Sequence, residues 1–252
     1  MKSKVIFKLA DKCKLNVLWS KKLIKVDKMN LKQCIFSAFT LAEVLLTMTI
    51  VGIVAALTIT VLIPGIQYQI MLNRLKEGYN EITQATKLIA FNNNGTMINS
   101  YSTYTDLKNN YEKYLNYSQD CNSGLGVCWP SNIIFANGNG PVNSYWGSAT
   151  NTPSIILNNR LIITFSGDDA GPSCNSNWSN YYPSNTVCYL VFLDVTGING
   201  TKIWGTDIFG FWVLSDSSVV PNGINGDYFS PATTGCSTGS GQGCTKLYLW
   251  GQ

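Results

Sequence analysis

The sequence contains no histidine, and only 13% of its 252 residues are charged. Without an imidazole, Ser-His-Asp and Cys-His catalysis and histidine-based metal sites are excluded. An enzyme built from this chain would have to rely on carboxylates, lysine, tyrosine or an external cofactor, and the sequence offers no convergent pair of acids. We therefore expect no catalytic activity. The many Asn, Ser, Thr, Gly and Tyr residues are typical of an exported, loop-rich β domain.

Basic residues are scarce beyond the N-terminal segment. Residues 1–38 hold ten lysines against two aspartates, a local net charge of +8. Residues 39–252 hold eight Lys or Arg against twelve Asp or Glu, a local net charge of −4. A nucleic-acid-binding protein needs its basic residues on the folded part of the chain. The charge distribution therefore predicts no contact with nucleic acid.

A long apolar run follows the basic segment. From Phe39 to Ile63 the chain has 25 residues with a single charge, Glu43. As a helix this run is roughly 37 Å long, enough to cross a hydrocarbon core of ~30 Å. A buried core helix or an ordinary secretory signal peptide has a shorter apolar stretch. Because lysines crowd the N-terminal side, we expect residues 1–38 in the cytoplasm and the remainder outside the membrane.

The helix is expected to continue beyond the apolar run. After Pro64, which should kink it, apolar and aromatic residues recur at helical spacing and form a stripe on one face: Tyr68, Leu72, Leu75, Tyr79, Ile82 and Ile89. The stretch Asn92-Asn93-Asn94-Gly95 supplies a stop signal, with Gly95 as a left-handed cap. We therefore predict one long helix with an apolar half, residues 39–63, and an amphipathic half, residues 64–94.

The residues FTLAE at 39–43, the basic leader before them and the amphipathic helix after them resemble type IV pilins and the pseudopilins of type II secretion. In that family a prepilin peptidase cuts on the cytoplasmic side of the apolar run and the new N-terminal Phe is methylated. The resemblance implies cleavage between Ala38 and Phe39, which removes residues 1–38. The family usually has Gly where this chain has Ala38. Translation from Met29 would leave a ten-residue leader, nearer the family's usual length.

The resemblance also implies a role for Glu43, the fifth residue of the cleaved chain. A carboxylate inside a membrane costs several kcal/mol unless it is paired, and such residues are usually functional. The amine of Phe39 on a neighbouring subunit is a natural partner, and the pair would set the axial register between subunits. The alternative is a glutamate at a helix start that interacts favourably with the helix dipole.

Six cysteines lie beyond the leader, after Cys13 and Cys34 within it. An even number on the exported side indicates disulfides, and neither CxxC spacing nor histidine supports a metal site. The six come in three close pairs, which makes the sequential pairing our first hypothesis among the possible connectivities: Cys121–Cys128, Cys174–Cys188 and Cys236–Cys244.

Residues 95–252 are predicted to form an extracytoplasmic, β-rich domain. A short helix is expected near 105–115, followed by a hairpin of 154–157 and 161–165 and by strands at 187–193 and 208–214. Residues 245–250 are predicted to form a last strand. The predicted fold class is α+β, with the long helix packed on a small antiparallel sheet of four or five strands stabilised by disulfides.

The segment 194–209 concentrates oxygen donors between two predicted strands, and it resembles a glycine-rich Asp/Asn signature of many pilin-like proteins. Major pseudopilins carry calcium in their C-terminal region, and Ca²⁺ prefers oxygen ligands. The resemblance therefore implies a possible calcium site formed by Asp194, Thr196, Asn199 and Asp207. The alternative is a turn in which Asp and Asn side chains accept hydrogen bonds from backbone N–H groups. No other cofactor is expected.

Together these features predict a structural subunit of a type IV pilus or type II secretion pseudopilus. Its expected partners are prepilin peptidase, other pilin or pseudopilin subunits and inner-membrane lipid. It would cross the inner membrane once before it enters an extracytoplasmic filament. The alternative is a membrane-anchored exported binding protein or adhesin that does not polymerise. The sequence leaves open whether such a filament serves secretion, motility, adhesion or DNA uptake.

Overall fold

The computed structural model describes residues 40–122, 127–140, 152–166, 171–174, 186–227, 229, 236 and 239–251. The chain divides into two units, Met1–Ala55 and Ala56–Gln252. The described part of the first unit is the start of helix α1. The second unit holds the remainder of α1 and all of the other helices and strands described below.

Helix α1 (Leu41–Asn92) is 52 residues long and continues through Pro64 without a break. It ends where the Asn-Gly stop signal predicts. Gly95 has a φ of 80°, and its N–H donates to the carbonyl oxygen of Ala90 at 2.8 Å. This hydrogen bond satisfies a carbonyl that the helix end would otherwise leave unpaired. The single long helix is confirmed, while the kink at Pro64 stays a prediction.

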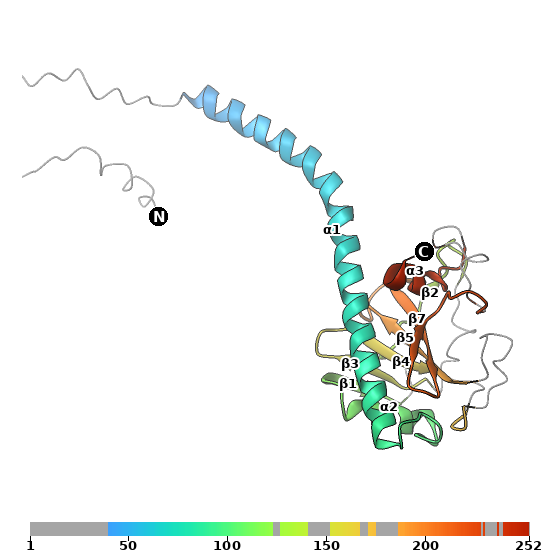
Figure 1. The fold of residues 1–252 in the computed structure, drawn as a ribbon. Helices are drawn as coiled ribbons and strands as arrows, with labels where there is room; N and C mark the ends of the chain where they lie inside the picture. The colour runs from blue at the N-terminus through green and yellow to red at the C-terminus, as the bar shows by residue number, and fades with distance from the viewer. Residues whose placement is uncertain are drawn as a thin grey trace, which may run out of the picture. The chain divides into compact units, whose positions relative to one another are not determined.

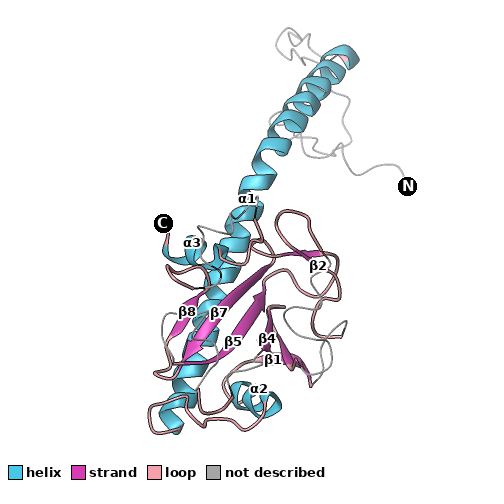
Figure 2. Ribbon diagram, turned by 90° about the vertical axis from the view of Figure 1, so that its right-hand side faces the viewer, coloured by secondary structure: helices cyan, strands magenta, loops and turns pink. Residues whose placement is uncertain are grey.

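A six-stranded antiparallel sheet forms the centre of the second unit, in the order β1-β3-β4-β5-β7-β8 (Figure 2). Its strands are β1 (Tyr117–Cys121), β3 (Ser154–Leu157), β4 (Ile162–Ser166), β5 (Val187–Asp194), β7 (Ile208–Leu214) and β8 (Val219–Pro221). A separate parallel pair joins β2 (Ile133–Ile134) to β6 (Lys202–Ile203). The four central strands match the sequence prediction, but the expected total is wrong because the short edge strands β1 and β8 join the sheet.

The predicted last strand is wrong, because residues Cys244–Trp250 form helix α3. Cys244 and Thr245 are buried, and Tyr248 and Leu249 are partly buried, so the residues facing the domain recur at i and i+4 as a helix requires. The hydroxyl of Thr245 accepts a hydrogen bond from the N–H of Gly210 at 3.1 Å. The ring of Tyr248 lies 5.9 Å from that of Phe209. These contacts with β7 fix α3 on the sheet.

Both faces of the sheet are covered. On one face, the second half of α1 and the short helix α2 (Tyr104–Glu112) pack against alternate strand residues such as Val191 and Leu193 (Figures 1 and 2). On the other face, Phe192 packs in a second apolar core that includes Trp204. Every residue of β5 and β7 is buried in consequence. The short helix predicted near 105–115 is confirmed.

Small residues let α1 approach the sheet closely. The buried positions of the helix include Gly78, Ala85 and Ala90 as well as Leu75 and Ile82. A Cβ added to Gly78 would lie 2.4 Å from Cδ2 of Leu193, well inside van der Waals contact. The glycine therefore makes room for a core side chain of β5. The stripe predicted from large apolar residues included only part of this buried face.

The three disulfides join the cysteines in sequential order, as predicted. Cys121–Cys128, Cys174–Cys188 and Cys236–Cys244 have Cα–Cα separations of 6.0, 4.0 and 5.4 Å. The second ties β5 to the segment before it, and the third holds the start of α3. Together with the one long helix, the disulfides confirm that the fold is α+β and disulfide-stabilised, as predicted.

Candidate functional site

The start of α1 holds Glu43, the acid for which the resemblance to pilins implies a role in subunit assembly. Its Oε2 accepts hydrogen bonds from the N–H of Thr40 at 2.8 Å and from Oγ1 of Thr40 at 3.0 Å. The N–H of Glu43 in turn donates to Oγ1 of Thr40 at 3.2 Å. This reciprocal pair is a capping box, which satisfies backbone groups that a helix start leaves free. Ala38 and Phe39, the predicted cleavage and methylation residues, lie outside the described residues.

The first part of α1 carries an extended apolar surface. Every residue from Leu41 to Ile70 is exposed except Ala55, which is half-buried. Within the part of the chain that the structure describes, α1 is the one helix long and apolar enough to cross a membrane. An exposed apolar surface of this kind is typical of a segment that contacts a membrane or another protein.

The loop after β5 is organised by Asp194. The carboxylate is fully buried, and Oδ1 accepts hydrogen bonds from the N–H groups of Thr196 at 2.7 Å and Gly197 at 3.0 Å and from Oγ1 of Thr196 at 3.0 Å. Burial raises the pKa of Asp194 to about 6, although these hydrogen bonds and Lys202 lower it. The contacts match the turn-capping alternative, in which an Asp side chain closes a local turn.

A cation belonging to the chain itself lies beside Asp194. Lys202 is almost fully buried, and its Nζ lies 4.0 Å from Oδ2 of Asp194 and 2.8 Å from Oγ1 of Thr196. The carboxylate of Asp207 has a different partner, because its Oδ2 accepts a hydrogen bond from the N–H of Ile203 at 2.9 Å. Asn199 is exposed at the tip of the loop. The structure thus joins Asp194 to Thr196 by hydrogen bonds, and it brings Thr196 and Asp207 to the lining of one groove.

No group of three or more acidic or cysteine side chains suited to a metal occurs among the residues placed in the structure. An ammonium group beside Asp194 already neutralises part of the charge that a Ca²⁺ ion would need. Calcium binding at this loop stays a prediction.

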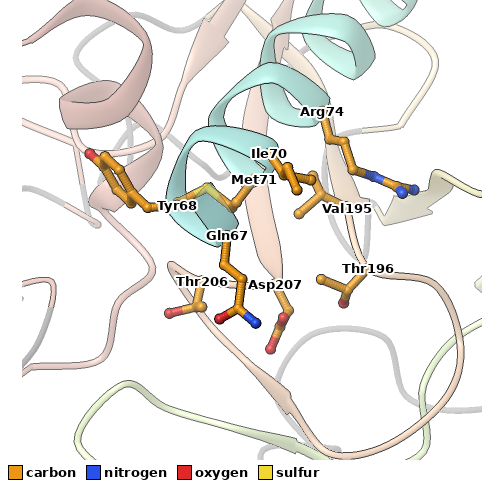
Figure 3. Close-up of a pocket in the computed structure, with 9 residues that line it drawn as sticks. All are labelled: Gln67, Tyr68, Ile70, Met71, Arg74, Val195, Thr196, Thr206 and Asp207. Atoms are coloured by element: carbon orange, nitrogen blue, oxygen red, sulfur yellow. The ribbon is translucent and has the colours of Figure 1, made fainter. Parts of the chain in front are cut away.

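A groove with a volume of about 530 Å³ lies between α1 and the segments that flank β6 (Figure 3). Its helix side and its loop side together comprise Gln67, Tyr68, Ile70, Met71, Arg74, Val195, Thr196, Thr206 and Asp207. Sequence reasoning missed this groove, because its two sides are more than 100 residues apart. A sequence feature that could have indicated the groove is Arg74, a charged residue that follows the exposed apolar residues Ile66 and Ile70 on the same helix.

Arg74 and Asp207 give the groove one cationic and one anionic side chain, and they come from opposite walls (Figure 3). Nη2 of Arg74 donates to the carbonyl oxygen of Asn159 at 3.1 Å, while its buried Nε has no partner among the described residues. Most of the remaining lining is apolar. This arrangement can hold a ligand that has separated positive and negative charges.

Comparisons with protein-family models, curated proteins and solved structures return no match for this chain.

Proposed function

We propose that this chain is a structural subunit of a type IV pilus or type II secretion pseudopilus, inserted in the inner membrane with its N-terminus inside. Prepilin peptidase would cut it between Ala38 and Phe39, and the helix beyond the cut would drive polymerisation. The proposal rests mainly on the two kinds of surface on α1. The first is apolar and exposed from Leu41 to Ile70, and the second is packed on a disulfide-stabilised antiparallel sheet.

A subunit that leaves the membrane for a filament must exchange lipid for other apolar surfaces, because exposed apolar helix is unfavourable in water. Identical helices in a bundle provide such surfaces. Glu43 is the one charged residue in this stretch, and the amine of Phe39 on a neighbour is its proposed partner. The sheet unit would then cover the outside of the filament.

The capping box at Thr40 makes a sharper test of Glu43 possible. Glu43→Gln removes the charge but leaves a side chain that can cap the helix, whereas Thr40→Val removes the cap and keeps the charge. We expect Glu43→Gln to abolish filaments and Thr40→Val to retain them, as judged by electron microscopy and surface shearing. Filaments from Glu43→Gln together with none from Thr40→Val would show that Glu43 acts only as a local cap.

Mass spectrometry of the mature N-terminus tests the processing step separately. We expect a chain that begins with methylated Phe39, and any other N-terminus would contradict the proposed cleavage. The alternative, a membrane-anchored exported binding protein or adhesin that does not polymerise, predicts a chain whose membrane insertion and surface display are indifferent to both helix-start variants.

A further inference from the structure

We propose that a second pocket, at the C-terminal end of α1, binds one ring of a neutral sugar, such as a hexopyranose at the end of a glycan. The inference goes beyond the proposed function, because it adds recognition of a ligand to a structural subunit. It needs the second unit to lie outside the membrane, and it does not depend on polymerisation.

The pocket has a volume of about 210 Å³ and lies between the C-terminal ends of α1 and α2. Figures 1 and 2 show α2 beside this end of α1. The polar side chains that line the pocket are Asn92, Asn93, Ser100, Asn110, Lys113 and Tyr114. Pockets for drug-sized ligands have volumes of ~300–1,000 Å³, so this smaller pocket suits a ligand with a single ring.

Hydrogen bonds within the lining hold its side chains in place. Nδ2 of Asn92 donates to the hydroxyl of Tyr114, and Nδ2 of Asn110 donates to the carbonyl oxygen of Ser100 at 2.8 Å. Nζ of Lys113 donates to Oδ1 of Asn110 at 2.7 Å. These contacts tie the end of α1 and the loop after it to α2 and the residues that follow α2. Because the side chains are already ordered, a ligand would not have to order them on binding.

Three of these side chains keep hydrogen-bonding groups for a ligand. Oδ1 of Asn92 accepts no hydrogen bond from the residues that the structure describes. The hydroxyl of Tyr114 accepts from Asn92 and can donate its own hydrogen, and the ammonium of Lys113 has two N–H donors beyond the one that reaches Asn110. Asn92, Lys113 and Tyr114 are all exposed, so a ligand in the pocket can reach them.

This mixture of donors and acceptors favours hydroxyl groups, because each hydroxyl both donates and accepts hydrogen bonds. An anion would face the partial negative charge of two helix C-termini, and a cation would be repelled by Lys113, the one charged side chain among the described residues that line the pocket. The ring of Tyr114 is 36% exposed and offers an apolar surface to the C–H face of a sugar. A wholly apolar ligand would instead leave the amide groups without partners.

The position of the pocket along α1 keeps it away from the bilayer. Asn92 is 29 residues past Ile63, or about 44 Å along the helix. The polar layer of a bilayer adds only ~5–8 Å on each side of the hydrocarbon core. In the proposed orientation the pocket therefore lies in the aqueous space outside the membrane, where a sugar can reach it.

The test uses the full chain in nanodiscs, because many detergents are themselves sugar derivatives. Saturation-transfer NMR measures the binding of the methyl glycosides of glucose, galactose and mannose, and of the corresponding methyl uronides as anionic probes. At least one neutral glycoside should bind, and it should bind more tightly than its uronide. Lys113→Met and Tyr114→Phe should each weaken that binding about tenfold, a difference of ~1.4 kcal/mol, because each removes donors from the pocket.

Lys76→Met and Tyr117→Phe are the matched controls, because they make the same changes at exposed positions outside the pocket. No binding of any neutral glycoside, tighter binding of the uronide, unchanged binding in the pocket variants, or equal losses in the controls would each overturn the proposal. Filament assembly and the mature N-terminus are measured on the same proteins. Filaments from a chain that binds no sugar refute the sugar pocket alone, whereas sugar binding without filaments refutes polymerisation and leaves the pocket.

Discussion

The two halves of α1 are built from similar apolar residues but have different surroundings. Ile59 in the first half is 52% exposed, whereas Ile82 in the second is fully buried against the sheet. The glycines differ in the same way. A Cβ added at Gly52 would meet no heavy atom within 4 Å, whereas one added at Gly78 would meet Leu193. Hydrophobicity alone therefore does not say whether a helical segment belongs to a core or awaits another surface.

The difference comes from the segments that pack on each half. Small residues recur on the buried face of the second half and permit close packing on β5. The first half also contains small residues, such as Gly52 and Ala56, but its large aliphatic side chains are exposed in the described chain. Four pairs of variants test this contrast.

The largest effect is expected from truncation of the buried face. Ile82→Ala should lower the free energy of unfolding by about 3 kcal/mol, because it leaves a cavity in a close-packed core. Ile59→Ala should change it by less than about 0.5 kcal/mol, because the side chain is exposed. Urea unfolding of the full chain in detergent, followed by tryptophan fluorescence, measures both. Equal losses would mean that the two halves share one folding unit.

A larger side chain should destabilise the protein at Gly78 but not at Gly52. Gly78→Val places a branched side chain against Leu193 and should cost about 2 kcal/mol of unfolding free energy. The same change at Gly52 meets open space and should leave the unfolding of the sheet unit unaltered. Thermal unfolding of both variants under the same conditions is the measurement, and a tolerated Gly78→Val would show that α1 is free to move away from β5.

Asp194 and Glu43 should also differ in their effect on the pH dependence of stability. Because burial raises the pKa of Asp194 to about 6, the folded protein binds that proton more tightly than the unfolded chain does. Stability should therefore increase as the pH falls from 7 to 5, by about 1 kcal/mol from this group. Asp194→Asn should remove that part of the pH dependence, measured by unfolding at each pH. Glu43→Gln, in the other unit, is the control and should retain it.

The smallest effect is expected where the β3–β4 hairpin meets α1. Nδ2 of Asn159 donates to Oε1 of Glu77 at 2.9 Å and to Oε1 of Glu81 at 3.2 Å. Asn159→Ala should cost about 0.5 kcal/mol, since it leaves two like charges one helical turn apart. Gln69→Ala on the exposed stretch is the comparison and should be neutral. A larger loss from Gln69→Ala would reverse the assignment of the buried and exposed stretches.

Local patterns predicted much of the fold. The helix and its end follow from the residue spacing and from Asn94-Gly95, both of which have positive φ. The hairpin of β3 and β4 follows from two apolar runs around an Asn-rich turn, although the turn also includes Arg160 at a φ of 67°. The uninterrupted apolar runs of β5 and β7 are typical of strands buried on both faces. The residues of these two strands are therefore consistent with a sheet that is covered on each side.

Other features depended on contacts that spacing does not encode. Strand β1 is short, polar and mostly exposed, so nothing in its residues marks it as part of a sheet. The C-terminal helix depends on Tyr248 reaching Phe209, and the same apolar residues also suit a strand. At the loop after β5, the turn around Asp194 was predictable because its partners are two and three residues away. The burial of Lys202 beside it was not.

By itself, the sequence determined a long apolar and then amphipathic helix, the four central strands and the solitary acid at the helix start, and it made the sequential disulfide pairing the first hypothesis. Each of these depends on residues close together in the chain or on bulk composition. Only the tertiary structure decided which face of α1 is buried and that Arg74 and Asp207 share a groove. Those outcomes bring together segments more than 100 residues apart, and they depend on how side chains of particular sizes and charges fit once the sheet has formed.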